Sequence, residues 1–153
     1  MRDGAIKRRT RLLVVEDHPA TARGLEKYLT LVGYEVVIAT NASTARELAG
    51  EIEFDVLVSD LTLPDGTGLE LLAWLKTKMP VRAIVFSAHD DDRSRRQSKA
   101  AGFLDYVVKG TDFDVLVRAI ERAARGEGPA LTPPSISETR RGVPGRERAV
   151  ASS

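Results

Sequence analysis

Five short apolar runs alternate with segments of helical periodicity along this chain, and that alternation constrains its fold more than any other feature. The runs lie at residues 12–15, 34–39, 56–58, 81–86 and 104–108. Because each run is joined to the next through a helix, consecutive strands must be parallel, with the helices packed against the sheet. The sequence therefore predicts an α/β fold, a doubly wound five-stranded parallel sheet with helices on both faces.

The segments between the runs carry the start and stop signals of helices. Pro19 stands near the start of the first helix, and Asn41 is a good N-cap for the second. Thr111 or Asp112 is expected to cap the last one. Trp74, the sole tryptophan, falls near the inner face of its helix, which favours a role in packing. Glycines mark the expected helix ends, at Gly33, Gly50, Gly102 and Gly126.

The composition changes at both ends of the chain. Residues 1–10 are basic and indicate a flexible arm. Residues 127–153 are rich in Pro, Gly, Ser and Arg and hold too little apolar surface to fold alone, which predicts a disordered tail. The stretch between them, residues 11–126, has the length of one domain.

Charge and composition exclude several classes of protein. The formal net charge of +1 gives no global field that would favour nucleic acid or a membrane surface. There is no cysteine, which excludes disulfides and thiolate metal sites. No stretch approaches the roughly 20 apolar residues that cross a bilayer, and the amino terminus lacks the apolar core of a signal peptide. We therefore expect a cytoplasmic protein that makes no membrane contact.

Polar side chains follow four of the predicted strands, at the point where each strand ends. They are Glu16 with Asp17, then Asp60, Ser87 and Lys109. Parallel strands deliver their carboxyl ends to one edge of the sheet, and ligands of open α/β sheets bind at that edge. The sequence thus predicts that three carboxylates, a hydroxyl and an ammonium group lie close together.

Such a set of groups is suited to phosphoryl transfer. Carboxylates this close repel one another by roughly 1 to 4 kcal/mol per pair at a partly wet site, so a cation is expected among them. Mg²⁺ prefers oxygen ligands, and a lysine suits a phosphate oxygen. Asp60 is then the candidate nucleophile. Any one of these acids, taken singly, is more often a helix cap or a loop residue; the joint pattern carries the interpretation.

The same residues resemble the receiver domain of two-component response regulators, over about residues 10–126. Four segments carry the resemblance: Glu16-Asp17, residues 60–68 (DLTLPDGTG), residues 86–88 (FSA) and residues 102–109 (GFLDYVVK). The resemblance implies a flavodoxin-like fold with strand order 2-1-3-4-5. It also implies a phosphoryl acceptor rather than a turnover enzyme.

The resemblance assigns roles to individual residues. Asp60 is the implied phosphoacceptor. The implied Mg²⁺ ligands are Glu16, Asp17, Asp60 and the Thr62 carbonyl, and the implied phosphate-binding residues are Ser87 and Lys109. Ser87 and Tyr106 are the implied switch residues, and His89 is expected at the rim of the site.

Partners follow from the resemblance as well. A histidine kinase or a histidine phosphotransfer protein would supply the phosphoryl group. A downstream protein would read the surface of the last two helices, and homodimers are a family expectation. The cluster of Arg93, Arg95, Arg96 and Lys99 is interpreted either as a solvated face or as part of that docking surface. No helix-turn-helix follows residue 126, so direct DNA binding is not expected.

Two departures from the family pattern keep alternatives open. Gly110 stands where the family commonly has proline after the lysine, and Glu16 replaces a more frequent aspartate. One alternative is a receiver-like interaction module that is never phosphorylated; another is the receiver segment of a larger regulator or hybrid kinase. A phosphatase of the haloacid-dehalogenase class would need a second acid two residues after the nucleophile, and Thr62 stands there.

Overall fold

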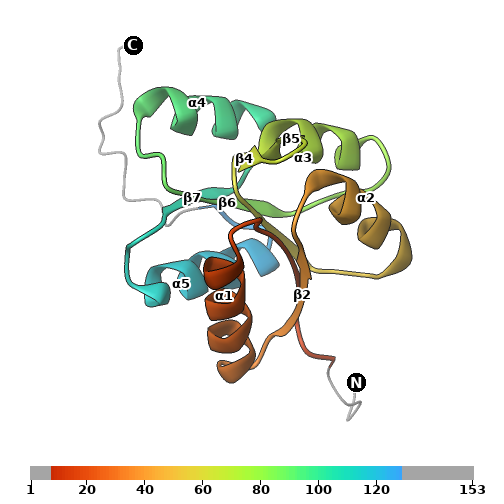
Figure 1. Ribbon diagram of the computed structural model, residues 1–153, viewed down its shortest axis with the longest axis vertical. Helices are drawn as coiled ribbons and strands as arrows, with labels where there is room; N and C mark the ends of the chain where they lie inside the picture. The colour runs from red at the N-terminus through yellow and green to blue at the C-terminus, as the bar shows by residue number, and fades with distance from the viewer. Residues whose placement is uncertain (1–7, 129–153) are drawn as a thin grey trace, which may run out of the picture.

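The computed structural model describes residues 8–128, and its centre is a five-stranded sheet in which every pair of neighbouring strands is parallel. The strands are β1 (Arg11–Val15), β2 (Glu35–Ala39), β3 (Val56–Ser59), β6 (Ala83–Ser87) and β7 (Asp105–Val108). Their order is β2-β1-β3-β6-β7 (Figure 1). Counted along the five sheet strands alone, this is the expected order 2-1-3-4-5, and the predicted fold class is confirmed.

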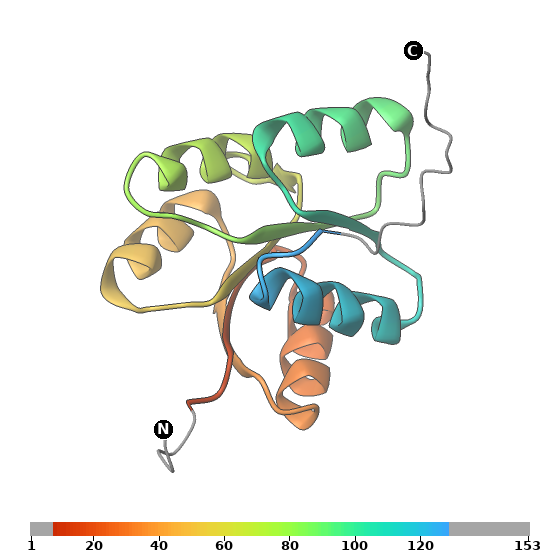
Figure 2. The same cartoon turned by 180° about the vertical axis from the view of Figure 1, so that it is seen from behind.

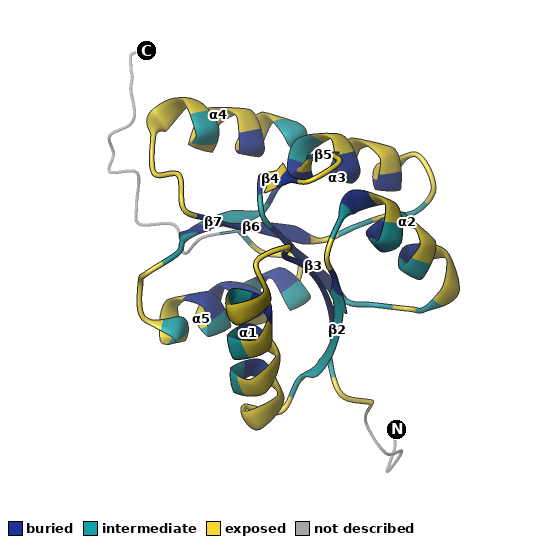
Figure 3. Cartoon of the chain, viewed as in Figure 1, coloured by how far each residue is buried: buried dark blue, intermediate teal, exposed yellow. Residues whose placement is uncertain are grey.

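Within residues 8–128, five helices cover the two faces of the sheet. They are α1 (Pro19–Leu31), α2 (Ala42–Glu51), α3 (Gly68–Lys76), α4 (Asp92–Ala101) and α5 (Phe113–Ala124). The α2, α3 and α4 helices lie on one face, and α1 and α5 lie on the other, as Figures 1 and 2 show from opposite sides. The central strands β3 and β6 are buried along their whole length (Figure 3). Side chains of alternate strand residues therefore pack into two separate hydrophobic cores, one on each face of the sheet.

The helix termini follow local capping chemistry in most cases. Asn41 accepts a hydrogen bond from the Thr44 amide, and Asp112, rather than Thr111, caps α5. Gly102 ends α4 with a positive φ of 107°. The prediction that Gly50 stops α2 is wrong: the helix continues through it to Glu51, and the chain leaves at Ile52 in an extended conformation that requires no glycine.

Two features differ from the sequence prediction. After β3 the chain forms a short antiparallel pair, β4 (Thr62–Leu63) with β5 (Gly66–Thr67), which the sequence pattern did not indicate. Trp74 does not pack in the core; its side chain is 41% exposed. Arg46 of α2 and Lys78 just beyond α3 both place their cationic groups less than 6 Å from the centre of its ring.

No helix among residues 8–128 is long and apolar enough to cross a membrane. The predicted basic arm, residues 1–10, lies mostly outside the described residues. The predicted tail, residues 127–153, lies almost wholly outside them.

Candidate functional site

Neighbouring strands hold the acidic residues through backbone hydrogen bonds just beyond the strand ends. The Glu16 amide donates to the Ala39 carbonyl at 2.9 Å, and the Asp60 amide donates to the Val15 carbonyl at 3.1 Å. The sheet ladder thus continues one residue past β1 and β3. The acids are fixed by the sheet itself rather than by a free loop, which favours a well-defined arrangement of their side chains.

Lys109 joins two of these acids. Its Nζ lies 2.7 Å from Asp60 Oδ2 and 2.7 Å from Glu16 Oε1. Its backbone amide donates to the Ser87 carbonyl, which anchors the lysine to the end of β6. Partial burial acts to lower the pKa of Lys109, but the hydrogen bonds with Asp60 and Glu16 outweigh it and raise that pKa above its usual value. Lys109 is therefore charged at neutral pH.

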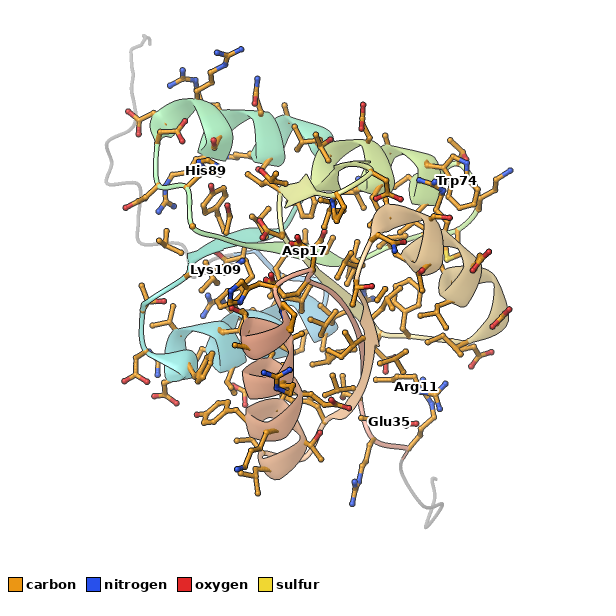
Figure 4. The ribbon with its side chains drawn as sticks, viewed as in Figure 1. Arg11, Asp17, Glu35, Trp74, His89 and Lys109 are labelled. Carbon is orange, nitrogen blue, oxygen red and sulfur yellow. The ribbon has the colours of Figure 1, made fainter. Side chains whose placement is uncertain are left out.

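Glu16, Asp17 and Asp60 form a cluster at this edge. One carboxylate oxygen from each lies within 4.8 Å of those of the other two. Glu16 is almost fully buried and Asp17 is exposed, so the cluster opens to solvent on one side. Figure 4 labels Asp17 and Lys109, which lie near one another in that view. Glu16 Oε2 accepts the His18 amide, and the buried Oε1 faces the Lys109 ammonium at 2.7 Å.

These donors fit a hard divalent cation. Mg²⁺ takes oxygen ligands, and the cluster offers three carboxylates that each place one oxygen within reach of a common ion. The positive charge of Lys109 balances part of the negative charge but leaves more carboxylates than ammonium groups at the site. A divalent cation is consistent with that imbalance.

The β4–β5 hairpin closes one side of the site. The Thr62 amide lies 3.4 Å from Asp60 Oδ1. Gly68, the first residue of α3, packs so tightly under this segment that a Cβ there would lie 2.3 Å from the Asp60 carbonyl oxygen. The glycine therefore permits α3 to begin directly against the strand end that carries Asp60.

Ser87 and Tyr106 both bond to the backbone of His89. The Ser87 side chain is fully buried, and its Oγ accepts the His89 amide at 3.1 Å. The Tyr106 hydroxyl donates to the His89 carbonyl at 2.8 Å, and the Arg95 guanidinium lies 4.7 Å from the centre of its ring. The segment around His89 thus contacts both predicted switch residues.

An open cavity of about 540 Å³ contains most of the predicted site residues. Liquid water occupies roughly 30 Å³ per molecule, so the cavity has room for a phosphoryl group and its water shell. Glu16, Asp17, Asp60, Thr62 and Lys109 line it, and so does His89 at its rim; Ser87 does not. Sequence reasoning missed five lining residues: His18, Thr21, Leu63, Pro64 and Ala88. Each is a sequence neighbour of a predicted residue or lies one turn into α1, which is the signal that could have identified it.

Gly110 adopts a φ of 93°, which proline cannot reach because its ring fixes φ near −65°. A Cβ at this position would meet no atom within 4 Å. Glycine is therefore favoured here by its backbone conformation and not by lack of space for a side chain. Lys109 nevertheless reaches Asp60. The departure from the family pattern therefore changes the loop after the lysine without removing its contact with the acids.

Comparison with known proteins is consistent with this geometry. The model of the family described as response regulator receiver domain matches residues 12–121. The transcriptional regulatory protein KdpE of Mycobacterium tuberculosis is 35% identical over 116 residues, which cover 76% of this chain and 51% of KdpE. The chain thus spans about half the length of KdpE and of other curated relatives that it matches.

Two solved structures are similar along most of the chain. The response regulator TrrA of Thermotoga maritima, solved in complex with Mg²⁺-BeF, has 31% identity and a TM-score of 0.67, covering 74% of this chain and 98% of that one. A LuxR-family response regulator from Aurantimonas sp. has 30% identity and a TM-score of 0.74, covering 86% of this chain and 94% of that one.

Proposed function

This chain belongs to the response regulator receiver family, and we propose that it accepts a phosphoryl group on Asp60 in a Mg²⁺-dependent reaction. The carrying observation is the contact of Lys109 Nζ with Asp60 Oδ2 at 2.7 Å, beside two further acids within 4.8 Å. An acid beside a lysine in an open cavity can attack phosphorus, and the ammonium group can stabilise the product.

The transfer is a substitution at phosphorus. One carboxylate oxygen of Asp60 forms a bond to phosphorus as the bond from phosphorus to a histidine nitrogen of the donor breaks. The electron pair of the broken bond stays on the imidazole, which is neutral if its other nitrogen carries a proton. A histidine kinase or a histidine phosphotransfer protein is the proposed donor. Lys109 can hold an oxygen of the transferred group, because its ammonium already lies in the cavity.

Mg²⁺ is the proposed cofactor, held by Glu16, Asp17, Asp60 and the Thr62 carbonyl. When bound, it would neutralise negative charge on the acids and on the phosphoryl oxygens. TrrA was solved with Mg²⁺ and a beryllium fluoride, which supports this choice for a chain with the same fold and 31% identity. Asp60 is then a stoichiometric acceptor rather than the nucleophile of a turnover enzyme.

A hydrogen-bonded route leads from the site to a second cavity. His89 lines the site, and its carbonyl accepts the Tyr106 hydroxyl. Tyr106 in turn lines a cavity of about 940 Å³ between α4, β7 and α5, together with Lys99, Phe103 and Arg122. We infer that a phosphoryl group would draw Ser87 Oγ away from the His89 amide, which loosens the His89 segment and frees Tyr106 to move.

This second cavity is the proposed surface for a downstream protein or a second copy of the chain. Arg95 and Lys99 are exposed there, as expected for either interpretation of the basic cluster. Direct DNA contact by residues 11–126 is not proposed, although KdpE is a transcriptional regulator. The cytoplasmic location and the unfolded tail stay predictions.

Intact-mass spectrometry after incubation with acetyl phosphate and Mg²⁺ tests the proposal. One phosphoryl group should be added to the wild type and none to Asp60→Asn. Asp55→Asn is the matched control, because Asp55 precedes the same strand at its opposite end, where it binds the Arg11 amide. Labelling of Asp60→Asn would refute the assignment, and failure to label the folded wild type would favour the unphosphorylated module.

A further inference from the structure

Asp65 lies at the tip of the β4–β5 hairpin and binds a helix that follows a different strand. Its Oδ1 accepts the Ala42 amide at 2.8 Å, and its Oδ2 accepts the Ser43 amide at 2.9 Å. These are the first two amides of α2, and the third, that of Thr44, is bound by Asn41. The amino end of α2 is thus capped from two sources, one local and one from the hairpin.

The helix end that Asp65 binds is itself connected to the acidic cluster. The α2 helix follows β2, and the last residue of β2, Ala39, accepts the Glu16 amide. The hairpin that carries Asp65 begins at Thr62, whose amide lies 3.4 Å from Asp60 Oδ1. Asp65 therefore links the segment after Asp60 to the segment that holds Glu16, across 22 or 23 residues of sequence.

The β4–β5 hairpin is short, and Leu63 is the one of its residues that packs in the core. Its two strands are two residues each, and Pro64 and Asp65 are exposed. An isolated hairpin of this size is at best marginally stable. The amides of Ala42 and then Ser43 hold the pKa of Asp65 below its ordinary value, so the carboxylate is charged when it binds them.

We propose that Asp65 is a positioning residue for the acceptor site, holding the Thr62 backbone in place against Asp60 by fastening the hairpin to α2. This inference rests on the proposed function, since Thr62 matters only if its carbonyl helps to bind the cation. A residue that acts only as a helix cap would affect the stability of α2 and nothing at the site. Asp65 is expected to affect both.

Asn41 provides a matched control, because it caps the same end of the same helix without touching the hairpin. Asp65→Ala and Asn41→Ala should both weaken α2 and lower the unfolding midpoint. Only Asp65→Ala should weaken the binding of Mg²⁺, measured by isothermal titration calorimetry with the metal alone. Loss of a supporting residue of this kind costs about tenfold in metal affinity. Asp65→Asn, which keeps one accepting oxygen, should fall between Asp65→Ala and the wild type.

Amide hydrogen exchange in the metal-free protein gives a second readout. The Leu63 amide should exchange faster in Asp65→Ala than in Asn41→Ala. At saturating Mg²⁺, the labelling of Asp60 by acetyl phosphate should approach the wild-type rate in Asp65→Ala, because the acids and the lysine are unchanged.

The inference would be overturned if Asp65→Ala bound Mg²⁺ as tightly as the wild type. It would also be overturned if Asp65→Ala and Asn41→Ala lost the same amount of Mg²⁺ affinity. A wild type that binds Mg²⁺ but is never labelled would instead overturn the proposed function. The difference in Mg²⁺ affinity between Asp65→Ala and Asn41→Ala would still test the role of Asp65. If the wild type bound no Mg²⁺, unchanged exchange in the hairpin of Asp65→Ala would overturn the inference independently.

Discussion

The α3 and α4 helices lie next to one another on the same face of the sheet, yet they are held to it in different ways. The α3 helix buries three leucines, Leu71, Leu72 and Leu75, in the core. The buried residue of α4 is Ser98, whose hydroxyl bonds to the Ser94 carbonyl one turn earlier in the same helix. Figure 3 shows the contrast as broad dark patches on α3 and a largely yellow α4.

The difference teaches which part of the molecule can move at low free-energy cost. Local opening is cheapest where few apolar contacts are lost. Arg95 of α4 pairs with Asp90 of the preceding loop at 2.6 Å and contacts the ring of Tyr106 on β7. Because α4 borders the larger cavity, the weakly held helix is the one that a bound partner would meet.

The largest expected effect is at α3. Leu72→Ala should lower the free energy of unfolding by about 2–5 kcal/mol, because a fully buried leucine is lost and a cavity is left. Ser98→Ala, the matched change in α4, should cost less than about 1 kcal/mol, since the hydroxyl bonds only within its own helix. Urea denaturation followed by far-UV circular dichroism measures both. Similar losses in the two variants would show that α4 contributes as much to the core as α3.

A second contrast uses the glycines that begin α3 and follow α4. Gly68→Ala should cost about 1–3 kcal/mol, because the new Cβ meets the Asp60 backbone at 2.3 Å. Gly102→Ala should cost about 1–2 kcal/mol, through its positive φ, since the nearest atom is the flexible end of Lys76. Gly68→Ala should also slow the labelling of Asp60, and Gly102→Ala should not. Slower labelling of Asp60 in Gly102→Ala than in Gly68→Ala would contradict this prediction.

A third prediction concerns Arg95. Arg95→Ala should change global stability by less than about 1 kcal/mol, because its ion pair and its ring contact are both at the surface. Amide exchange across α4 and the NMR signals of Tyr106 should nevertheless change. Arg93→Ala, an exposed neighbour on the same helix, serves as the control and should leave the Tyr106 signals as they are.

The smallest effect is the pH dependence of the α4 cap. The Ser94 amide, followed by the Ser94 hydroxyl, lowers the pKa of Asp91 from its ordinary value of 3.8. The folded state therefore binds the proton less readily than the unfolded state, so the cap contributes fully above that value and is lost as pH falls through the lowered pKa. Asparagine caps helices about as well and does not titrate. The melting temperatures of wild type and Asp91→Asn should thus diverge in favour of the variant below about pH 4; parallel curves would contradict this.

The sequence allowed the acidic edge to be predicted because parallel strands end at one side of a sheet. Glu16, Asp60 and Lys109 needed only correct strand ends to be brought together. The β4–β5 pair was missed because strands of two residues have no readable period. The link from Asp65 to α2 was missed because its partners are distant in sequence and are backbone amides, which every residue has. Trp74 was misplaced because one position on a helix turns a side chain by about 100°, enough to leave the apolar stripe.

The position of Trp74 gives this protein an optical reporter of its own. An indole that is half in water, with cations from two different structural elements beside it, emits according to how those elements are spaced. Since the chain has no second tryptophan, every change in emission is assigned without labelling. A shift in its spectrum on ligand addition would register displacement of α2 against α3. Tyr106 lies elsewhere, on the edge strand β7.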